Sequence, residues 1–140
     1  MSLISIVYIS SARQLFSDQA LHELLDLSRR NNATRDITGL LLYWDGNFLQ
    51  YVEGPEAAVD ALLDRIRIDP RHDGVIVLDR ATIAKRAFPD WRMGYQRLKQ
   101  PEPANGGMST YLGDGDLGQQ ADTLPSHVRH LIELFRDNMR

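Results

Sequence analysis

The sequence predicts an α+β fold, in which a five-stranded mixed β-sheet carries two helices on one face. Three observations predict it. Short runs rich in β-branched residues alternate with two longer runs whose apolar residues recur at helical spacing. A hairpin signal joins the two halves of this pattern. The resulting order, β-α-β-β-α-β followed by one extra strand, is that of the ferredoxin-like split βαβ motif.

The first strand and the first helix are predicted within the first 36 residues. Residues 3–9 form a short, apolar run rich in β-branched residues, which is typical of a buried strand. Ser17 is the expected N-cap of the helix, because its hydroxyl can accept a hydrogen bond from a free N–H of the first turn. Residues 29–36, "RRNNATRD", are expected to end this helix. Its apolar stripe consists of Leu21, Leu24, Leu25 and Leu27.

A β-hairpin is predicted over residues 38–54, "TGLLLYWDGNFLQYVEG". Its Asp-Gly dipeptide separates two apolar runs and favours a tight type I′ turn. Phe48, Gln50 and Val52 share one face of the second strand, because side chains alternate along a strand. Phe48 and Val52 are expected core residues, so Gln50 places a primary amide in the core. A buried amide without partners costs about 1–3 kcal/mol, so we expect Gln50 to contact a side chain or a ligand.

The second half of the chain repeats the order of strand, helix and strand. Pro55 suits the first position of the second helix, and Pro70 is expected to end it. Residues 74–83, "GVIVLDRATI", and residues 91–98, "WRMGYQRL", are predicted to form the last two strands. The apolar side of the second helix consists of Val59, Leu62, Leu63 and Ile66.

Two parts of different composition divide the chain. Residues 1–98 are expected to form one domain, and residues 99–140 a linker and a C-terminal helical extension. Residues 99–123 are rich in proline, glycine and polar residues, which favours a linker, with one short helix expected around Thr110. Residues 124–140 have the apolar spacing of an amphipathic helix, at Val128, Leu131, Ile132 and Phe135. We expect this helix, or a partner subunit, to cover the second face of the sheet.

Composition excludes several functional classes. The chain of 140 residues has a net charge of −3, so it lacks the basic surface that nucleic acid binding requires. It contains no cysteine, which excludes disulfides, thiolate chemistry and cysteine-ligated metal sites. No apolar run approaches the roughly 20 residues that span a bilayer, and the N-terminus lacks the features of a signal peptide. We therefore expect a cytoplasmic protein without membrane or nucleic acid partners.

Motifs for metal, nucleotide or hydrolytic chemistry are weak or absent. His127 and His130 lie three residues apart, but a solvated helix face explains them better than a metal site does. Residues 113–118, "GDGDLG", lack the spaced oxygen ligands and the final glutamate of a calcium loop. There is no glycine-rich dinucleotide or triphosphate loop, and no serine on a nucleophile elbow. The sequence therefore predicts no metal and gives little support to a hydrolase.

Polar and aromatic residues are predicted to converge on one space, between the two helices and over the central strands. Except for Gln50, each has an ordinary explanation when taken singly: a core tyrosine, a helix C-terminal signal, an exposed i,i+4 pair, or core packing on the last strand. Trp91 and Met93, for example, are expected to share one face of that strand. Together they are too many for an ordinary core. These residues are Tyr8, Asn31, Asn32, Gln50, Arg65, Asp69, Trp91 and Met93.

Four collinear segments within residues 2–98 resemble the BLUF family, the blue-light sensors that use FAD. They are "IVYISSA", "SRRNNATRDITGLLLYWDGNFLQYVEG", "RIRIDPRHDGVIVL" and "RAFPDWRMGY". Each segment alone is weakly specific, and the four together are highly specific. The resemblance implies the fold predicted above and a non-covalently bound FAD. The short chain with a helical tail is similar to the small stand-alone members of the family.

The resemblance also implies roles for individual residues. Tyr8 matches the tyrosine that donates an electron and then a proton to the excited flavin, and Gln50 matches the glutamine that lies between them and switches its hydrogen bonds. Asn32 matches the asparagine that bonds to the carbonyl edge of the ring, and Asn31 lies where members vary. The remaining residues implied to surround the ring are Leu24, Arg65, Ile66 and Asp69.

Trp91 and Met93 match the pair on the last strand that exchanges with the signalling state, and the sequence leaves open which of them faces the flavin in the dark. Light sensing without turnover implies that the protein is not an enzyme. Because no effector domain follows within the chain, its output is expected to go through an unidentified effector protein or a homodimer. FAD rather than FMN is implied by the resemblance, since no motif identifies an adenine.

Two alternatives stay open from the residues themselves. The first is a small ferredoxin-like hydrolase of the acylphosphatase type, which would need a phosphate-binding glycine loop after the first strand. Residues 10–17, "SSARQLFS", contain no such loop. The second is a flavin-free ferredoxin-like module for ligand binding or dimerisation, which would leave Gln50 unexplained.

Overall fold

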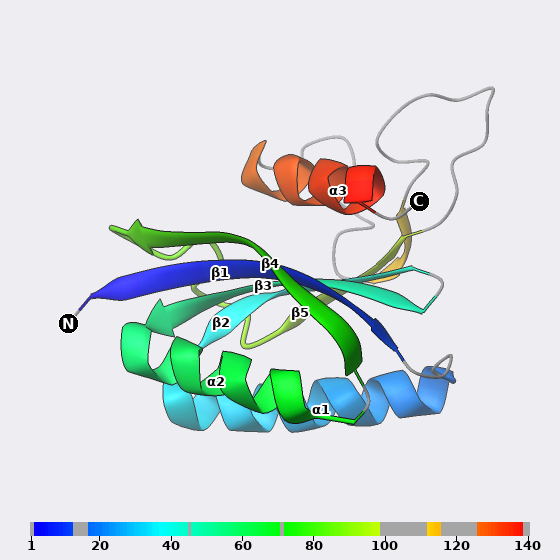
Figure 1. Ribbon diagram of the computed structural model, residues 1–140, viewed down its shortest axis with the longest axis horizontal. Helices are drawn as coiled ribbons and strands as arrows, with labels where there is room; N and C mark the ends of the chain where they lie inside the picture. Colours follow the sequence, from blue (N-terminus) through cyan, green and yellow to red (C-terminus); the bar gives the residue numbers. More distant parts are fainter. Residues whose placement is uncertain are drawn as a thin grey trace.

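The computed structural model describes residues 2–12, 17–44, 46–70, 72–98, 112–115 and 126–138. Its strands form one sheet between two layers of helices (Figure 1). No helix among these residues is long and apolar enough to cross a membrane. In chain order the elements are β1 (Leu3–Ala12), α1 (Asp18–Arg35), β2 (Thr38–Trp44), β3 (Asn47–Pro55), α2 (Glu56–Ile68), β4 (His72–Ile83), β5 (Gly94–Leu98), β6 (Leu112–Gly115) and α3 (Ser126–Asn138).

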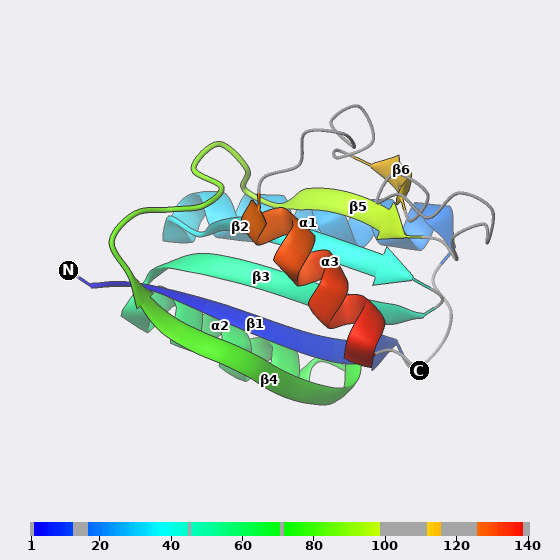
Figure 2. The same ribbon diagram turned by 90° about the horizontal axis from the view of Figure 1, so that it is seen from above.

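The order of the strands across the sheet is β4-β1-β3-β2-β5-β6. β1 pairs antiparallel with both β3 and β4, and β2 pairs antiparallel with β3. β5 then adds to β2 in the parallel direction, which makes the sheet mixed. The predicted ferredoxin-like arrangement of five strands, with α1 and α2 on one face, is confirmed. α3 lies on the opposite face, across β1 and β3 (Figure 2).

β6 is a short strand within the segment that the composition assigned to a linker. It pairs antiparallel with β5, with Gln96 opposite Gly115 and Leu98 opposite Leu112. The expectation of a linker was therefore wrong for residues 112–115, because an available strand edge can order a polar segment through backbone hydrogen bonds alone. The helix expected around Thr110 lies outside the described residues. The division of the chain at residue 98 stays a prediction.

α1 begins and ends where the sequence predicts, because its last residue, Arg35, lies within the expected closing segment 29–36. Ser17 is its N-cap and accepts a hydrogen bond from the backbone N–H of Ala20, with an N–O distance of 3.1 Å. The helix continues through Asn31 and Asn32 and ends at Arg35; Asp36, with φ of 59°, is the left-handed residue that follows. The explanation of Asn31 and Asn32 as a C-terminal signal was therefore wrong. Both side chains are instead presented by the last regular turns of the helix.

The hairpin has the predicted two-residue turn. Trp44 pairs with Asn47, and Gly46 has a φ of 82°, which a residue without Cβ adopts at low cost. Asp45 lies outside the described residues. The predicted parity is also confirmed, because Phe48 and Val52 belong to the core beneath α1 and α2. Gln50 lies between them on the same face.

α2 is bounded by prolines on both sides. Pro55 is the last residue of β3 and the N-cap of the helix, and the helical residues begin at Glu56, one position later than predicted. Asp69 has extended backbone with ψ of 122°, as expected for a residue that precedes a proline. Pro70 therefore ends the helix, and β4 starts at His72, two residues before the predicted run.

The last predicted strand is shorter in the structure. β5 begins at Gly94, so Trp91 and Met93 precede it, and the expectation that they share one strand face was wrong. Met93 is buried beneath the helices, whereas Trp91 packs on the α3 side of the sheet. Period-two alternation requires extended backbone, and here the chain turns, with the Trp91 N–H bonded to the Phe88 carbonyl.

The sheet separates two hydrophobic cores. One lies beneath α1 and α2, and the other beneath α3. The apolar residues of α3 face the sheet and are almost completely buried: Val128, Leu131, Ile132 and Phe135.

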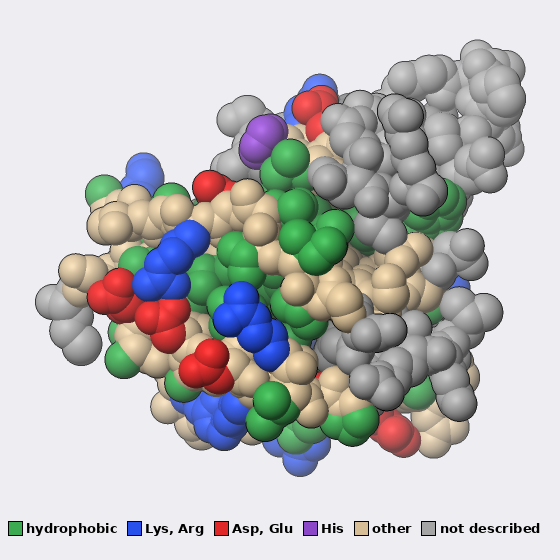
Figure 3. All heavy atoms as spheres, viewed as in Figure 1, with side chains coloured by type: hydrophobic (Ala, Val, Ile, Leu, Met, Phe, Trp, Pro, Cys, Tyr) green, Lys and Arg blue, Asp and Glu red, His purple; other side chains and the backbone are tan. Residues whose placement is uncertain are grey.

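Basic and acidic side chains are interspersed on the face of the molecule that Figure 3 shows. On β4, Arg80 binds Glu56 and Asp60 of α2, and all three side chains are about half exposed. The Arg80 guanidinium lowers the pKa of Asp60 below its ordinary value. Such exposed pairs contribute little to stability, so burial on the two faces of the sheet is the main stabilising contribution.

Replacing Phe135 with alanine tests the packing of α3. Phe135→Ala should lower the free energy of unfolding by about 3–5 kcal/mol, because it removes a fully buried ring from the core beneath α3. The exposed Glu133 on the same helix provides a control, and Glu133→Ala should change stability by less than about 0.5 kcal/mol. Urea unfolding measures both. Equal stability of the two variants would contradict the contact between α3 and the sheet.

Candidate functional site

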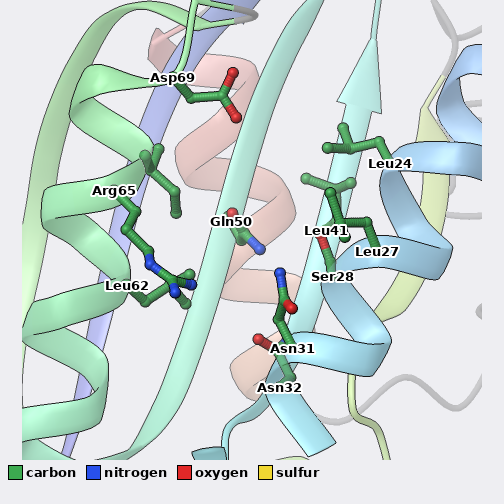
Figure 4. Close-up of a pocket in the computed structure, with 11 residues that line it drawn as sticks. Leu24, Leu27, Ser28, Asn31, Asn32, Leu41, Gln50, Leu62, Arg65 and Asp69 are labelled. Atoms are coloured by element: carbon green, nitrogen blue, oxygen red, sulfur yellow. The ribbon is translucent and has the colours of Figure 1, made fainter. Parts of the chain in front are cut away.

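A cavity of about 200 Å³ opens between α1 and α2. Figure 4 shows the two helices contributing side chains from opposite sides, with Gln50 of β3 between them. The floor consists of the sheet residues Leu41 and Gln50. The α1 wall consists of Leu24, Leu27, Ser28, Asn31 and Asn32, and the α2 wall of Leu62, Arg65, Ile66 and Asp69.

The structure brings the predicted cofactor residues together at this cavity, with one exception. Leu24, Asn31, Asn32, Gln50, Arg65, Ile66 and Asp69 all line it. Tyr8 does not line it and lies in the strand next to Gln50. The antiparallel register pairs Tyr8 of β1 directly with Gln50 of β3 and pairs Gln50 with Leu41 of β2. Tyr8, Gln50 and Leu41 therefore form a row of neighbouring side chains across the sheet.

Four lining residues were missed, although the sequence contains signals for them. Leu27 and Ser28 follow Leu24 by three and four residues, so they share its helix face. Leu62 precedes Ile66 by four residues in the same way. Leu41 lies opposite Gln50 once the two-residue turn fixes the hairpin register. Helical spacing and hairpin register would have found all four.

Gln50 is 8% exposed and has the partner that its predicted burial requires. Its amide Nε2 donates a hydrogen bond to the thioether sulfur of Met93, with an N–S distance of 3.4 Å. A thioether is a weak acceptor, so this bond satisfies the amide less well than an oxygen would. Gln50 is therefore held in place but retains hydrogen-bonding capacity toward the cavity.

Tyr8 is 1% exposed, and its hydroxyl has no hydrogen-bond partner within the described part of the chain. A buried hydroxyl without a hydrogen-bond partner lowers the stability of the folded protein by about 1–3 kcal/mol. Burial raises the pKa of the Tyr8 phenol above its ordinary value of 10.0, and the negative charge of Asp69 raises it further. Tyr8 is thus a neutral phenol, next to Gln50, with an unused proton donor.

The carboxyl end of α1 holds the segment that carries Met93. Asn32 is 1% exposed, and its Nδ2 donates to the carbonyl oxygen of Arg92 at 2.6 Å. The Nε of Arg29 donates to the carbonyl oxygen of Met93 at 3.0 Å. Asn31, one position earlier than Asn32, is half-buried and points into the cavity (Figure 4). These bonds fix Met93 relative to Gln50.

The chemistry of the cavity suits a flat molecule with apolar faces and a polar edge. Leu24 and Ile66 supply aliphatic groups from opposite helices, and Asn31 supplies an amide at the end of the cavity. Arg65 and Asp69 add a positive and a negative charge on the α2 side. The described residues contain no group of three or more His, Cys, Asp or Glu side chains that could hold a metal ion. The cavity therefore fits an organic ligand bound by amides and aliphatic contacts.

Comparison with known proteins identifies the family. Residues 3–94 match the model of the BLUF family, described as sensors of blue light using FAD. The chain belongs to the BLUF family. The match extends from β1 to the first residue of β5, so it includes every element that lines the cavity, and BLUF proteins are flavin-binding light sensors by that description.

The curated relatives are much longer proteins. One is the β subunit of photoactivated adenylate cyclase from Euglena longa, 40% identical over 93 residues, which cover 66% of this chain and 11% of the relative. Another is the blue light- and temperature-regulated antirepressor BluF of Escherichia coli K12, 33% identical over 76 residues, which cover 54% of this chain and 19% of the relative. The chain thus spans about a tenth of the length of the relatives matched first.

Two solved structures match almost the whole chain. The dark-state structure of BlrB, a BLUF protein, has a TM-score of 0.70 and 29% identity, and the match covers 99% of this chain and 98% of BlrB. The structure of Klebsiella pneumoniae BlrP1 with FMN and cyclic diGMP has a TM-score of 0.73 and 26% identity, and covers 97% of this chain and 35% of BlrP1. The fold is therefore that of BLUF proteins.

The raised pKa of Tyr8 predicts a pH dependence of stability. Folded Tyr8 keeps its proton while unfolded Tyr8 ionises near pH 10, so its stabilising contribution is complete below pH 10 and is lost as the pH rises toward the folded pKa. Between pH 8 and pH 11, the original protein should lose about 1.4 kcal/mol more stability than Tyr8→Phe does. Urea unfolding at both pH values measures this difference. The same loss in both proteins would show that Tyr8 ionises normally in the folded state.

Proposed function

We propose that this chain is a blue-light photoreceptor domain that binds FAD non-covalently in the cavity between α1 and α2. The observation that carries the proposal is the row of Tyr8, Gln50 and Leu41. In this row the buried phenol of Tyr8 lies next to the amide of Gln50, which lines the cavity. The flavin, when bound, supplies a chromophore that absorbs blue light and accepts an electron. Binding of the flavin, donation of the electron and the proton, and the change of hydrogen bonds are roles of side chains of the chain.

Flavin binding follows from the chemistry of the walls. Leu24 and Ile66 would hold the two faces of the ring, because aliphatic groups from opposite helices suit a flat apolar surface. Asn31 and Asn32 bind its polar edge, since an amide can both donate and accept. Further polar contacts come from the α2 side of the cavity, at Arg65 and Asp69.

Tyr8 acts as the electron and proton donor. A phenol that is buried, neutral and free of a hydrogen-bond partner is available for oxidation once the chromophore is excited. A phenol that has lost an electron is a strong acid, so the electron and then the proton of Tyr8 would both pass to the bound flavin. Both return to Tyr8 when the dark state is restored, so there is no net turnover, and the chain is a sensor without enzymatic activity.

Gln50 acts as the hydrogen-bond switch. Its amide presents a donor at one end and an acceptor at the other, and reversal of the amide, or its tautomer, exchanges them. In the present arrangement Nε2 donates to Met93. A reversed Gln50 would present its oxygen to the Met93 sulfur, where no donor is available, and the contact would be weakened. A change at Gln50 is therefore passed directly to Met93.

The signal leaves through the segment of Met93 and Trp91. Met93 faces the cavity side and Trp91 the α3 side, so displacement of this segment affects both faces of the sheet. The output then passes to a partner protein, to a second copy of this chain or to a further domain. Relatives named as an adenylate cyclase subunit and as an antirepressor show that outputs differ among the proteins that contain this domain.

An absorption spectrum of the purified protein, in the dark and then under blue light, tests the proposal. We expect the bands of a bound flavin and a small red shift that reverses in the dark. Release of the cofactor by heat, followed by chromatography against FAD and FMN standards, should give FAD. A protein that remains colourless after incubation with FAD would contradict the photoreceptor function and favour a flavin-free binding module.

Variants of Tyr8 and Gln50 separate binding from photochemistry. Tyr8→Phe and Gln50→Leu should both retain flavin, because the walls of the cavity remain, and both should lose the reversible red shift. Difference spectra before and after illumination measure the loss. Ser28→Ala, which alters a lining residue outside the row, is a matched control that should keep the photocycle. A complete photocycle in either variant would refute the role proposed for that residue.

A further inference from the structure

Glu53 is a completely buried carboxylate on the α3 side of the sheet, with an exposure of 0%. Each of its oxygens accepts one hydroxyl and one backbone N–H. Oε1 accepts from the Tyr51 hydroxyl at 2.8 Å and from the Ala87 N–H at 2.7 Å. Oε2 accepts from the Thr38 hydroxyl at 2.9 Å and from the Phe88 N–H at 2.8 Å. Four charge-assisted bonds of this length hold the surrounding groups firmly.

Arg86 strengthens the same attachment. One terminal nitrogen donates to the Thr38 hydroxyl at 2.9 Å and to the Glu53 carbonyl oxygen at 3.3 Å. The other donates to the Asp36 carbonyl oxygen at 2.7 Å. The residues that begin the segment 86–93 are thus fastened to β2 and β3 through Glu53 and Thr38.

The far end of segment 86–93 is held on the opposite face of the sheet. Gln50 donates to the Met93 sulfur, and Asn32 donates to the Arg92 carbonyl. Between the two ends, the rings of Phe88 and Trp91 stack, with centroids 5.6 Å apart and planes inclined by 13°. Both rings pack in the core beneath α3. The segment therefore connects the cavity side with the α3 side.

β3 holds both ends of this segment. Gln50 and Glu53 are three residues apart on β3, and their side chains therefore leave the strand on opposite faces. Gln50 binds Met93 at the end of the segment, and Glu53 binds Ala87 and Phe88 at its beginning. A shift of Met93 must then either move the rings of Phe88 and Trp91 or break the bonds to Glu53.

A contribution to stability alone does not explain the choice of a carboxylate here. Removing a charge from water is unfavourable, and well-packed apolar residues often stabilise a core as well as a buried ionic group does. A carboxylate with four donors does, however, fix the orientation of backbone groups, which apolar contacts cannot do.

We propose that Glu53 is a positioning residue for the light response. It fixes the beginning of segment 86–93, so that Met93 rests against Gln50 in the dark. A change at Gln50 is then transmitted through the segment to Phe88 and Trp91 beneath α3. This inference rests on the proposed photochemical function. Glu53 touches neither the cavity nor Tyr8, and acts through the segment alone.

The variant Glu53→Gln tests the proposal in the flavin-loaded full chain. The substitution keeps the size of the side chain but replaces one acceptor oxygen with an NH₂ group, which faces a backbone N–H that cannot reverse. Flavin binding and formation of the red-shifted state should persist. Return to the dark spectrum should be slowed about threefold to tenfold, because the dark contact between Met93 and Gln50 is less well supported, by about the contribution of one hydrogen bond.

Tyr51→Phe is the matched control. It removes one hydroxyl donor from Glu53 but leaves the bonds to Ala87 and Phe88, so it should lower stability to a similar degree without changing the recovery rate more than about twofold. Parallel urea unfolding measures the loss of stability in each variant. Slower recovery in Glu53→Gln but not in Tyr51→Phe, at similar stability, supports a positioning role.

Recovery of Glu53→Gln at the original rate would overturn the inference and leave the proposed photoreceptor function intact. If Glu53→Gln does not fold, the same recovery measurement is made on Thr38→Val. This substitution removes the hydroxyl that joins Glu53 to Arg86 while keeping the side-chain volume. Slower recovery in Thr38→Val supports the proposal, and an unchanged rate overturns it. A wild-type chain that shows no light-induced shift would instead contradict the photoreceptor function itself.

Discussion

The pairing of β1 with β3 is the constraint on which the rest of the structure depends. It places Tyr8 directly opposite Gln50, beneath the two helices. Because side chains alternate along a strand, a slip of one residue would turn one of these two side chains to the other face of the sheet. The neighbouring apolar residues, such as Ile6 and Val52, oppose such a slip, because it would turn one strand's side chains away from the core beneath α1 and α2. The register of the core thus also sets the geometry of the site.

Polar groups in this protein are buried where a second element can hold them. The amide of Asn32 is satisfied by a carbonyl of the segment before β5, and the carboxylate of Glu53 by two N–H groups of the same segment. Two buried side-chain atoms have no partner among the described residues, the hydroxyl of Tyr8 and one terminal nitrogen of Arg35. An unsatisfied group is expected where a ligand or a functional rearrangement completes the bonding. Asn32 and Glu53 therefore fix the segment, whereas the Tyr8 hydroxyl, next to the cavity floor, is left without a partner.

Much of the fold and of the cavity could be predicted from the sequence, because it depends on local patterns. Apolar periodicity gave the helices, and the turn dipeptide fixed the hairpin parity that places Gln50 in the core. Tertiary contacts decided the rest. Trp91 and Met93 lie before β5 because the chain turns there, and β6 is ordered by pairing with the edge of β5. No local pattern indicated the role of Glu53, because the four hydrogen-bond donors to its carboxylate come from β2, from β3 and from a loop more than 30 residues away.

The sheet also separates the side chains of the site from the exposed surface of α3. All cavity-lining residues lie on one side of it, and α3 covers the other. The exposed residues of α3, such as Arg129, His130 and Glu133, therefore lie across the sheet from the cavity, where substitutions leave its lining unchanged. One light-absorbing layer can in this way be combined with many different outer layers, and new outputs can arise by changes confined to a single face.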